Sequence, residues 1–410
     1  MRARVRDTHA LAAGSAVSGV LAYVFFVLAT RALGATAAAP VSVLWTYWSF
    51  AAAALTFPVQ HWIARSVAAH KSEGAVYDAL PRVAAAVGVA ALVSGGLAWL
   101  GRDSLFHRGD PWFPLLVVCV TLGSGFIGVV RGGLSARHRF SSVAWALVAE
   151  NGVRCLVATA LIVVGAHASL SFGICLAIGS LVGLLWPSSF RFSSEGSDGD
   201  HESPLVFLGG AAGGQLIGQA MLTGGPVLLA LSGGSAQDVT ALFAALALFR
   251  APYTLALGLV SQLTGRLTTL VVEREHRSLR RVRVAILGST GVLLMIAGAL
   301  GAFVGPWLLP LIFGRNVQTD WLPSMLVAIG SALALANLVT TISIMAQSRS
   351  HAIARAWALA SIGGAVAFLA IPEPPLLRTC WVFVAAECIA LAALVFEEIR
   401  GSAQLDLARP

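Results

Sequence analysis

The chain has 410 residues, of which 57% are hydrophobic and only 11% are charged, and its mean hydropathy is +0.82. A transmembrane helix takes about 20 mostly apolar residues, so this composition suffices for about twelve spans and leaves little for a separate soluble domain. It excludes a soluble enzyme, a nucleic-acid-binding protein and a disordered scaffold. The net charge of +8 comes from basic residues flanking apolar runs, which indicates contact with anionic membrane lipids and a topology signal.

Apolar runs bounded by charges or turn residues predict twelve membrane-spanning helices in an all-α integral membrane protein. Their expected ranges are 10–30, 41–64, 82–100, 113–130, 142–164, 168–187, 204–231, 239–262, 284–312, 322–346, 353–372 and 379–398. The first run resembles a signal peptide, but it lacks a convincing cleavage site and many further spans follow it. We therefore expect it to be an uncleaved first helix.

One polar, acidic stretch at 188–203 divides the chain six spans to six. It predicts an N-terminal lobe at 1–187, a cytoplasmic linker at 188–203, a C-terminal lobe at 204–398 and a cytoplasmic tail at 399–410. With both termini in the cytoplasm, the inner segments hold 20 arginines and lysines against 5 in the outer loops, with Arg131 counted in an inner loop. This distribution predicts a multi-pass protein of the inner cell membrane with cytoplasmic termini.

The two halves of the chain resemble each other. The sequence Trp-Ala-Leu at 145–147 opens the fifth span and recurs at 357–359, where it opens the eleventh. An even number of spans in each half makes such repeats parallel, related by an axis along the membrane normal. Two lobes of this kind, with a cavity between them, are typical of transporters.

The sequence contains no recognisable catalytic motif: it has no Walker loop, no HExxH and no nucleophile elbow. We therefore expect a protein that is not an enzyme and needs no cofactor and no metal. The five cysteines all fall within apolar runs and none has CxxC spacing, which favours small core residues over disulfides or a zinc site. They are Cys119, Cys155, Cys175, Cys380 and Cys388.

Four ionisable residues lie inside predicted spans, where they are costly and normally face a partner or a water-filled cavity. Glu150 and Arg154 are four residues apart on one helix face, so they can pair. The pair is either structural or part of a cavity, in which Arg154 would bind substrate and Glu150 could couple transport to an ion. Arg250 has no acid within a helical turn and needs an acid on another helix or an anionic ligand. Glu387 could be that acid, a protonatable coupling site or a neutral hydrogen-bonded glutamic acid.

Milder polar and aromatic signals accompany these charges. Gln215 and Gln219, two candidate substrate-binding residues, lie four apart among glycines that allow close helix packing or local unwinding. The aromatic faces of Trp45 and Trp48 could stack on sugar rings, or could belong to a lipid-facing aromatic belt. Asn337 is expected to make an interhelical hydrogen bond.

Several segments in this layout resemble the Wzx-type polysaccharide flippases of the MOP exporter superfamily, which are relatives of the multidrug MATE exporters. Residues 28–50, LATRALGATAAAPVSVLWTYWSF, resemble the family's passage from span one to span two. Residues 129–154, VVRGGLSARHRFSSVAWALVAENGVR, resemble its hairpin between spans four and five. Residues 305–316, GPWLLPLIFGRN, resemble the end of its span nine.

This resemblance implies a MATE/MOP-like fold with a central, cationic cavity that holds a polyprenyl-pyrophosphate-linked oligosaccharide during its passage from the inner to the outer leaflet. By position it makes Arg250 a cavity residue, with Arg31 and Arg65 as further substrate-binding candidates. It also implies membrane lipids and glycan-assembly enzymes as partners, and no nucleic acid. The family would have an arginine in the middle of span one, and this chain has none.

Three alternatives stay open beside a flippase. A cation-coupled multidrug or small-metabolite exporter of MATE type is the first, although no acidic residue occurs in spans one or seven. A major-facilitator transporter also has twelve spans, but the Gly-Asp-Arg-Arg signature of that superfamily is absent. The third is a membrane scaffold that only anchors a glycan-assembly complex.

Overall fold

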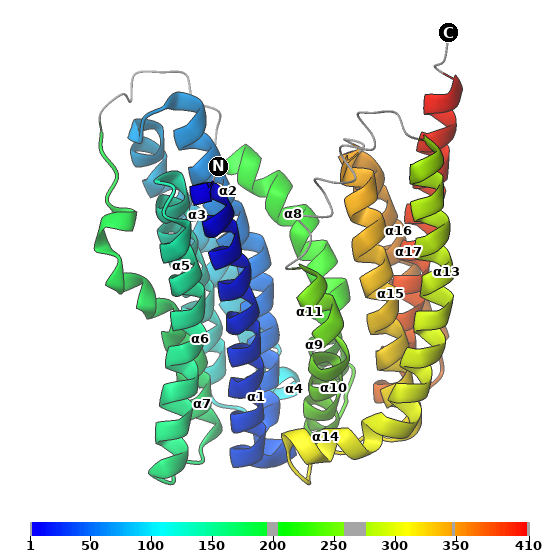
Figure 1. Ribbon diagram of the computed structural model, residues 1–410. Coiled ribbons are helices and arrows are strands. Elements are labelled where there is room, and N and C mark those ends of the chain that lie inside the picture. Colours follow the sequence, from blue (N-terminus) through cyan, green and yellow to red (C-terminus); the bar gives the residue numbers. More distant parts are fainter. Residues whose placement is uncertain (1, 195–203, 258–275, 347–348, 408–410) are drawn as a thin grey trace. The chain divides into compact units, whose positions relative to one another are not determined.

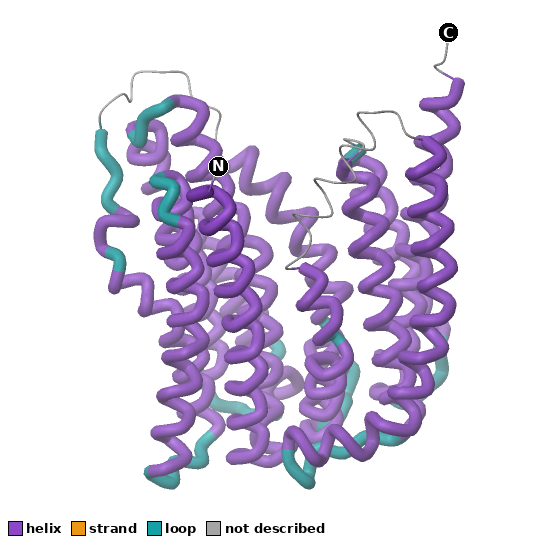
Figure 2. Tube along the Cα trace, viewed as in Figure 1, coloured by secondary structure: helices purple, strands orange, loops and turns teal. Residues whose placement is uncertain are grey.

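The computed structural model describes residues 2–194, 204–257, 276–346 and 349–407. All of these segments are helices or their connections, and no strand occurs among them (Figure 2). Within these ranges, eight helices are long and apolar enough to cross a membrane. Two shorter apolar helical segments, Ser169–Leu185 and Ala236–Phe249, accompany them. The predicted class, an all-α membrane protein, is confirmed.

The chain forms two compact units. The first comprises Met1–Ala220 and Ser235–Thr240, and the second comprises Met221–Gly234 and Ala241–Pro410. The predicted lobe boundary at 188–203 stays a prediction, because residues 195–203 lie outside the described ranges.

The first unit begins with two predicted spans joined into one helix, α1 (Arg2–Ala51). Its break is at Gly34, whose φ of 73° lies in the region that glycine alone adopts without strain. A single π-helical turn, η1 (Ala52–Thr56), then leads into α2 (Phe57–His70). The second predicted span therefore continues from the Gly34 break to His70.

The remaining helices of the first unit follow the predicted spans with shorter connections (Figure 1). They are α3 (Gly74–Leu100), the short α4 (Arg102–Phe106), α5 (Trp112–Ala136), α6 (Phe140–Val163), α7 (Ser169–Ile178), and the 3-10 turns η2 (Gly179–Leu185) and η3 (Pro187–Phe190). The connection between spans two and three is shorter than the predicted ranges imply, because both helices extend beyond their apolar runs. Only Lys71–Glu73 separates them.

Apolar side chains fill the contacts between these helices. One cluster joins α2 to α3 and includes Val59, Ile63, Val76 and Val83. Another joins α5, α6 and η2 and is made of Ile127, Val130, Leu134, Val143 and Val182. Other large apolar side chains point outward, as expected where lipid takes the place of water: Leu92 and Leu100 on α3 are 70% and 82% exposed.

A half-buried polar cluster around Arg137 lies at the end of the first unit that the predicted topology places in the cytoplasm. Its guanidinium donates to both carboxylate oxygens of Glu73, at 2.9 and 3.1 Å, and to the main-chain oxygens of Ser188 and Arg191. The Ser193 amide also donates to Glu73, at 3.1 Å. These bonds fix the segment after η3 against the α2–α3 connection.

The segments around the start of the second unit are broken helices. They are α8 (Pro204–Thr223), α9 (Gly225–Leu231), α10 (Ala236–Phe249) and α11 (Ala251–Leu257). The seventh predicted span is thus interrupted at Gly224 and the eighth at Arg250. The end of the eighth span, to residue 262, lies outside the described residues, as do Arg266 and Arg274 in the basic stretch that follows it.

The second unit continues with longer helices (Figure 1). They are α13 (His276–Ala299), the π-helical turn η4 (Leu300–Val304), α14 (Gly305–Phe313), α15 (Trp321–Ala346), α16 (Ser350–Ala370) and α17 (Pro375–Leu407). Ile344, Ala352, Ala356 and Leu394 form a cluster between α15, α16 and α17. These three helices position the buried acid described below.

Candidate functional site

Three charged side chains lie together inside the first unit. Glu150 on α6 accepts a hydrogen bond from Arg131 on α5, at 2.5 Å, and another from Arg154 on α6, at 2.8 Å. All three are buried, with Arg154 and Glu150 at 0% and 1% exposure. The predicted pairing of Glu150 with Arg154 is confirmed. Because two arginines share one glutamate, this Arg131–Glu150–Arg154 cluster carries a net charge of +1.

The predicted position of Arg131, in an inner loop, is wrong. The fourth span was expected to end at residue 130, but α5 continues to Ala136. The glycines serve packing: a Cβ at Gly133 would overlap the main chain of Ser189, and one at Gly132 would lie 2.8 Å from Ile63. Arg131 therefore belongs to the membrane-spanning helix, and its Nε has no hydrogen-bond acceptor among the described residues.

The guanidinium of Arg154 makes hydrogen bonds through all three of its nitrogens. Its Nε donates to the main-chain oxygen of Leu176, at 3.1 Å, and one terminal nitrogen donates to Asn151, at 2.9 Å. Gly179 leaves the room for it, because a Cβ at this position would overlap the guanidinium. Asn151 in turn donates to Ser18 on α1, at 2.9 Å. This arrangement is a rigid support and not an open ligand site.

The two tryptophans predicted to contact sugar differ in the structure. Trp45 is 8% exposed and packs against Phe25 and Phe26, with ring centroids at 5.4 and 6.2 Å. Trp48 is half-buried, and the Arg154 guanidinium lies 4.5 Å from its ring centroid. Trp45 is thus a core residue of α1, whereas Trp48 has partly accessible surface.

The other substrate-binding candidates lie on α1, α2 and α8 of the first unit. Arg31 on α1 and Arg65 on α2 are exposed. Gln219 on α8 is half-buried, and the side chain of Gln215 lies outside the described residues.

In the second unit, Arg250 lies at the break between α10 and α11. Its Nε donates to the main-chain oxygen of Leu246, at 3.1 Å, one turn earlier in its own helix. It is half-buried and forms no ion pair with a described residue. Arg250 therefore retains guanidinium donors for another partner.

Glu387 on α17 is fully buried beside Asn337 on α15. The Asn337 amide nitrogen donates to Oε2 of Glu387, at 2.7 Å, and to its main-chain oxygen, at 3.0 Å. The predicted interhelical hydrogen bond of Asn337 is confirmed. Two acceptors, Oε1 of Glu387 and Oδ1 of Asn337, have no hydrogen-bond partner in the described part of the chain.

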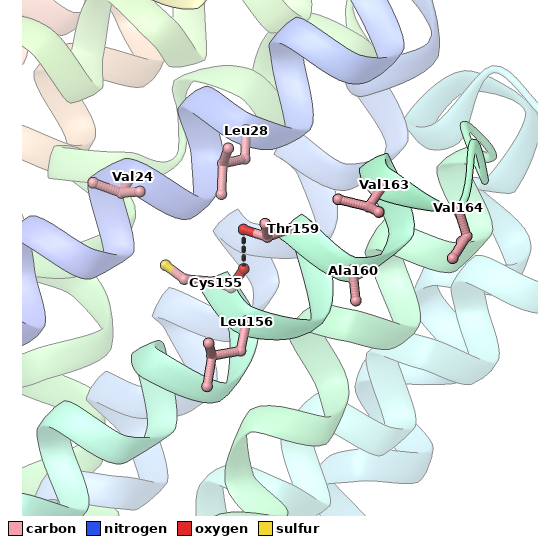
Figure 3. A pocket seen from close by; sticks show the side chains of 8 residues that line it. All are labelled: Val24, Leu28, Cys155, Leu156, Thr159, Ala160, Val163 and Val164. Atoms are coloured by element: carbon pink, nitrogen blue, oxygen red, sulfur yellow. Dashed lines mark hydrogen bonds between the residues drawn. The ribbon is translucent and has the colours of Figure 1, made fainter.

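An apolar groove of about 560 Å³ lies between α1 and α6 of the first unit (Figure 3). Val24 and Leu28 line it from α1, and Leu156 and Val163 line it from α6. The Thr159 hydroxyl donates its proton to the main-chain oxygen of Cys155, at 2.8 Å, so it cannot donate to a ligand. Such a groove suits an acyl or isoprenoid chain, but it carries no feature that selects between them.

The described residues contain no group of three or more histidine, cysteine, aspartate or glutamate side chains that could hold a metal ion. The five cysteines are free. Cys175 and Cys380 are buried, as expected, but Cys119 and Cys388 are exposed, so the prediction of core positions is wrong for these two. A cysteine is apolar enough to face lipid as well as protein.

No protein family and no curated protein matches the sequence. Solved structures do match its fold. An inward-facing multidrug resistance MATE transporter of the MOP superfamily has a TM-score of 0.67 at 15% identity, with 96% of each chain covered. The lipid II flippase MurJ, in an inward closed conformation, has a TM-score of 0.59 at 12% identity, covering 97% of this chain and 90% of that one.

A third match is a MOP superfamily transporter from Pyrococcus furiosus Vc1, described as having a binding pocket of reverse polarity. Its TM-score is 0.59 at 15% identity, over 98% of this chain and 95% of that one. The chain therefore has the fold of MOP superfamily transporters, which include both drug exporters and a lipid flippase. At these identities the likeness defines the fold alone.

Proposed function

We propose that this protein flips a polyprenyl-pyrophosphate-linked oligosaccharide from the inner to the outer leaflet by alternating access. The observation that carries the proposal is Arg250, a half-buried cation in a membrane-spanning segment that forms no ion pair with a described residue. A guanidinium in this setting favours an anionic ligand, and its planar fork matches two oxygens of a phosphate.

The charge of the first unit supports the same cargo. The Arg131–Glu150–Arg154 cluster keeps one uncompensated positive charge within the membrane-spanning region. This charge lowers the electrostatic free energy of a nearby anion in a medium of low dielectric constant. The half-buried Trp48 above Arg154 offers an aromatic surface for sugar rings.

A MATE-type exporter is the second candidate, since the multidrug transporter gives a TM-score of 0.67 against 0.59 for the lipid II flippase. Cation coupling in that class would draw on acidic residues in spans one or seven. Residues 10–30 and 204–231 contain none. The flippase accounts better for a membrane region with unpaired arginine charge.

The test is a deletion in the native host, followed by mass spectrometry of the lipid-linked oligosaccharides in the membrane. We expect one polyprenyl-pyrophosphate glycan to accumulate. The deletion strain is then complemented with variants. At equal membrane abundance, R250A should give glycan export about tenfold or more below that of the wild type, because charged hydrogen bonds to phosphate are lost. R250K should restore it partly.

The matched control is R315A, which removes an exposed arginine from the loop after α14 and should complement fully. An unchanged lipid-glycan profile after deletion, together with new sensitivity to cationic drugs, would assign the protein to the exporters instead. Full complementation by R250A would remove Arg250 from the site.

A further inference from the structure

Glu387 is a buried acid of the second unit that forms no ion pair with a described residue. Its side chain is 0% exposed and receives one side-chain hydrogen bond, from Asn337. No arginine, lysine or histidine of the described residues lies within ion-pair distance of it. An isolated carboxylate in such a place is far more costly than a neutral carboxylic acid.

The orphaned acceptors point to the same protonation state. Oε1 of Glu387 and Oδ1 of Asn337 are both buried without a donor among the described residues. A proton on Oε1 turns one of these two acceptors into a donor and removes the buried charge. Neutral Glu387 therefore fits its surroundings in this conformation, and ionised Glu387 does not.

The groups that could stabilise the ionised form lie on α11. Arg250 and Tyr253 are the described side chains there that interact electrostatically with Glu387. Helix α15 and the short α9 contain no ionisable residue, and α16 has none after Arg355. On α17 itself, Cys388 is the neighbouring titratable group.

Arg250 is placed to respond to the charge of Glu387. It lies between α10 and α11, and Pro252 in the next turn lacks an amide proton, so the helix is weakened at this point. Its guanidinium now binds its own helix through Leu246. A negative charge on Glu387 would attract it away from that position.

We propose that Glu387 is a proton-binding site of the second unit, which holds a proton in this conformation and pairs with Arg250 when the proton leaves. The step is the simple ionisation of a carboxylic acid: the O–H bond breaks, the proton goes to water, and the negative charge formed is balanced by the existing charge of Arg250. Proton release thereby changes the α10–α11 junction. This inference does not depend on the cargo.

Infrared difference spectroscopy of the purified full chain between about pH 6 and about pH 9 tests the proposal, because ordinary carboxyl groups are ionised throughout this range. We expect the band of a protonated carboxylic acid to disappear with rising pH in the wild type and to be absent from E387Q. E373Q, which changes a glutamate in the α16–α17 connection, should keep the wild-type titration.

A second variant and a second measurement keep the test independent of folding defects. R250M should hold the proton to a higher pH, since the ionised form loses its counter-charge. The hydrogen-exchange protection of peptides covering residues 246–257, after correction for the intrinsic pH dependence of amide exchange, should change with pH in the wild type and not in E387Q. A carboxyl band that is unchanged in E387Q, or a titration unaffected by R250M, would overturn the proposal.

Discussion

Arg154 lies with its guanidinium 4.5 Å from the ring centroid of Trp48, so a fully buried cation on α6 is stacked beneath a half-buried aromatic residue of α1. The same guanidinium is bonded to Glu150, which is shared with Arg131. A side chain with accessible surface is thereby connected, through contacts within one unit, to an ionic cluster deep in the membrane-spanning region.

Because Glu150 is shared by two arginines, we expect its neutralisation to destabilise the protein strongly. E150Q leaves two buried arginines without a counter-charge, and breaking a buried pair in this way costs about 3–5 kcal/mol. We expect a strong loss of folded protein, measured as membrane abundance and as the melting temperature in detergent. E373Q is the matched control and should be close to wild type, because Glu373 is not part of the cluster.

Exchanging Glu150 and Arg154 tests whether they form a simple pair, as the sequence pattern predicts, or a cluster with Arg131, as the structure shows. An arginine at position 150 would face Arg131, and a glutamate at position 154 would face the main-chain oxygen of Leu176. We therefore expect E150R with R154E to remain as unstable as either single change. Recovery of abundance in the double variant would mean that Arg131 does not share the glutamate.

The sequence analysis could predict this pair but not its third member. A spacing of four residues on one helix is visible in the sequence, whereas the approach of Arg131 depends on how α5 packs against α6. The glycines after Arg131 do not by themselves mark the end of the span, since glycine suits both turns and close helix packing. The apolar runs predicted the class and the order of the spans. Their ends were displaced where helices extend beyond the apolar run.

Glycine at position 179 predicts a second stability effect. G179A would place a methyl group against the Arg154 guanidinium and displace it from Glu150 or Leu176. We expect a lower melting temperature. G152A on α6 is the matched control, because a Cβ there has open space, and replacing a helical glycine by alanine should stabilise by about 0.5–1 kcal/mol. Equal effects of the two substitutions would contradict the packing argument.

The two tryptophans should respond differently to truncation. W45A empties a packed aromatic core and should cost about 3–5 kcal/mol, seen as reduced membrane abundance. W48A removes a cation–π contact of about 0.5–2 kcal/mol and an accessible aromatic surface. We expect it to reduce glycan export at near-normal abundance. Equal export per molecule in W48A and wild type would show that Trp48 serves the cluster alone.

The half-buried cluster around Arg137 predicts a dependence of stability on pH. Burial raises the pKa of the Glu73 carboxyl, but hydrogen bonds from Arg137 and the Ser193 amide, with the charge of Arg137, outweigh it, so this pKa lies below its usual 4.5. A carboxyl group with a depressed pKa stabilises the folded state fully above its unfolded-state pKa. That contribution is lost as the pH falls through the folded-state pKa.

At neutral pH the melting temperature of E73Q should therefore lie below that of the wild type by less than about 3 °C, since a solvent-accessible ion pair contributes little to the free energy of unfolding. The difference should shrink once the pH falls below about 4.5 and vanish at lower pH. Melting curves of both proteins in detergent across the acidic range measure it, with E373Q as control. A difference that persists unchanged at the lowest pH would show that the Glu73 carboxylate acts through its shape and not through its charge.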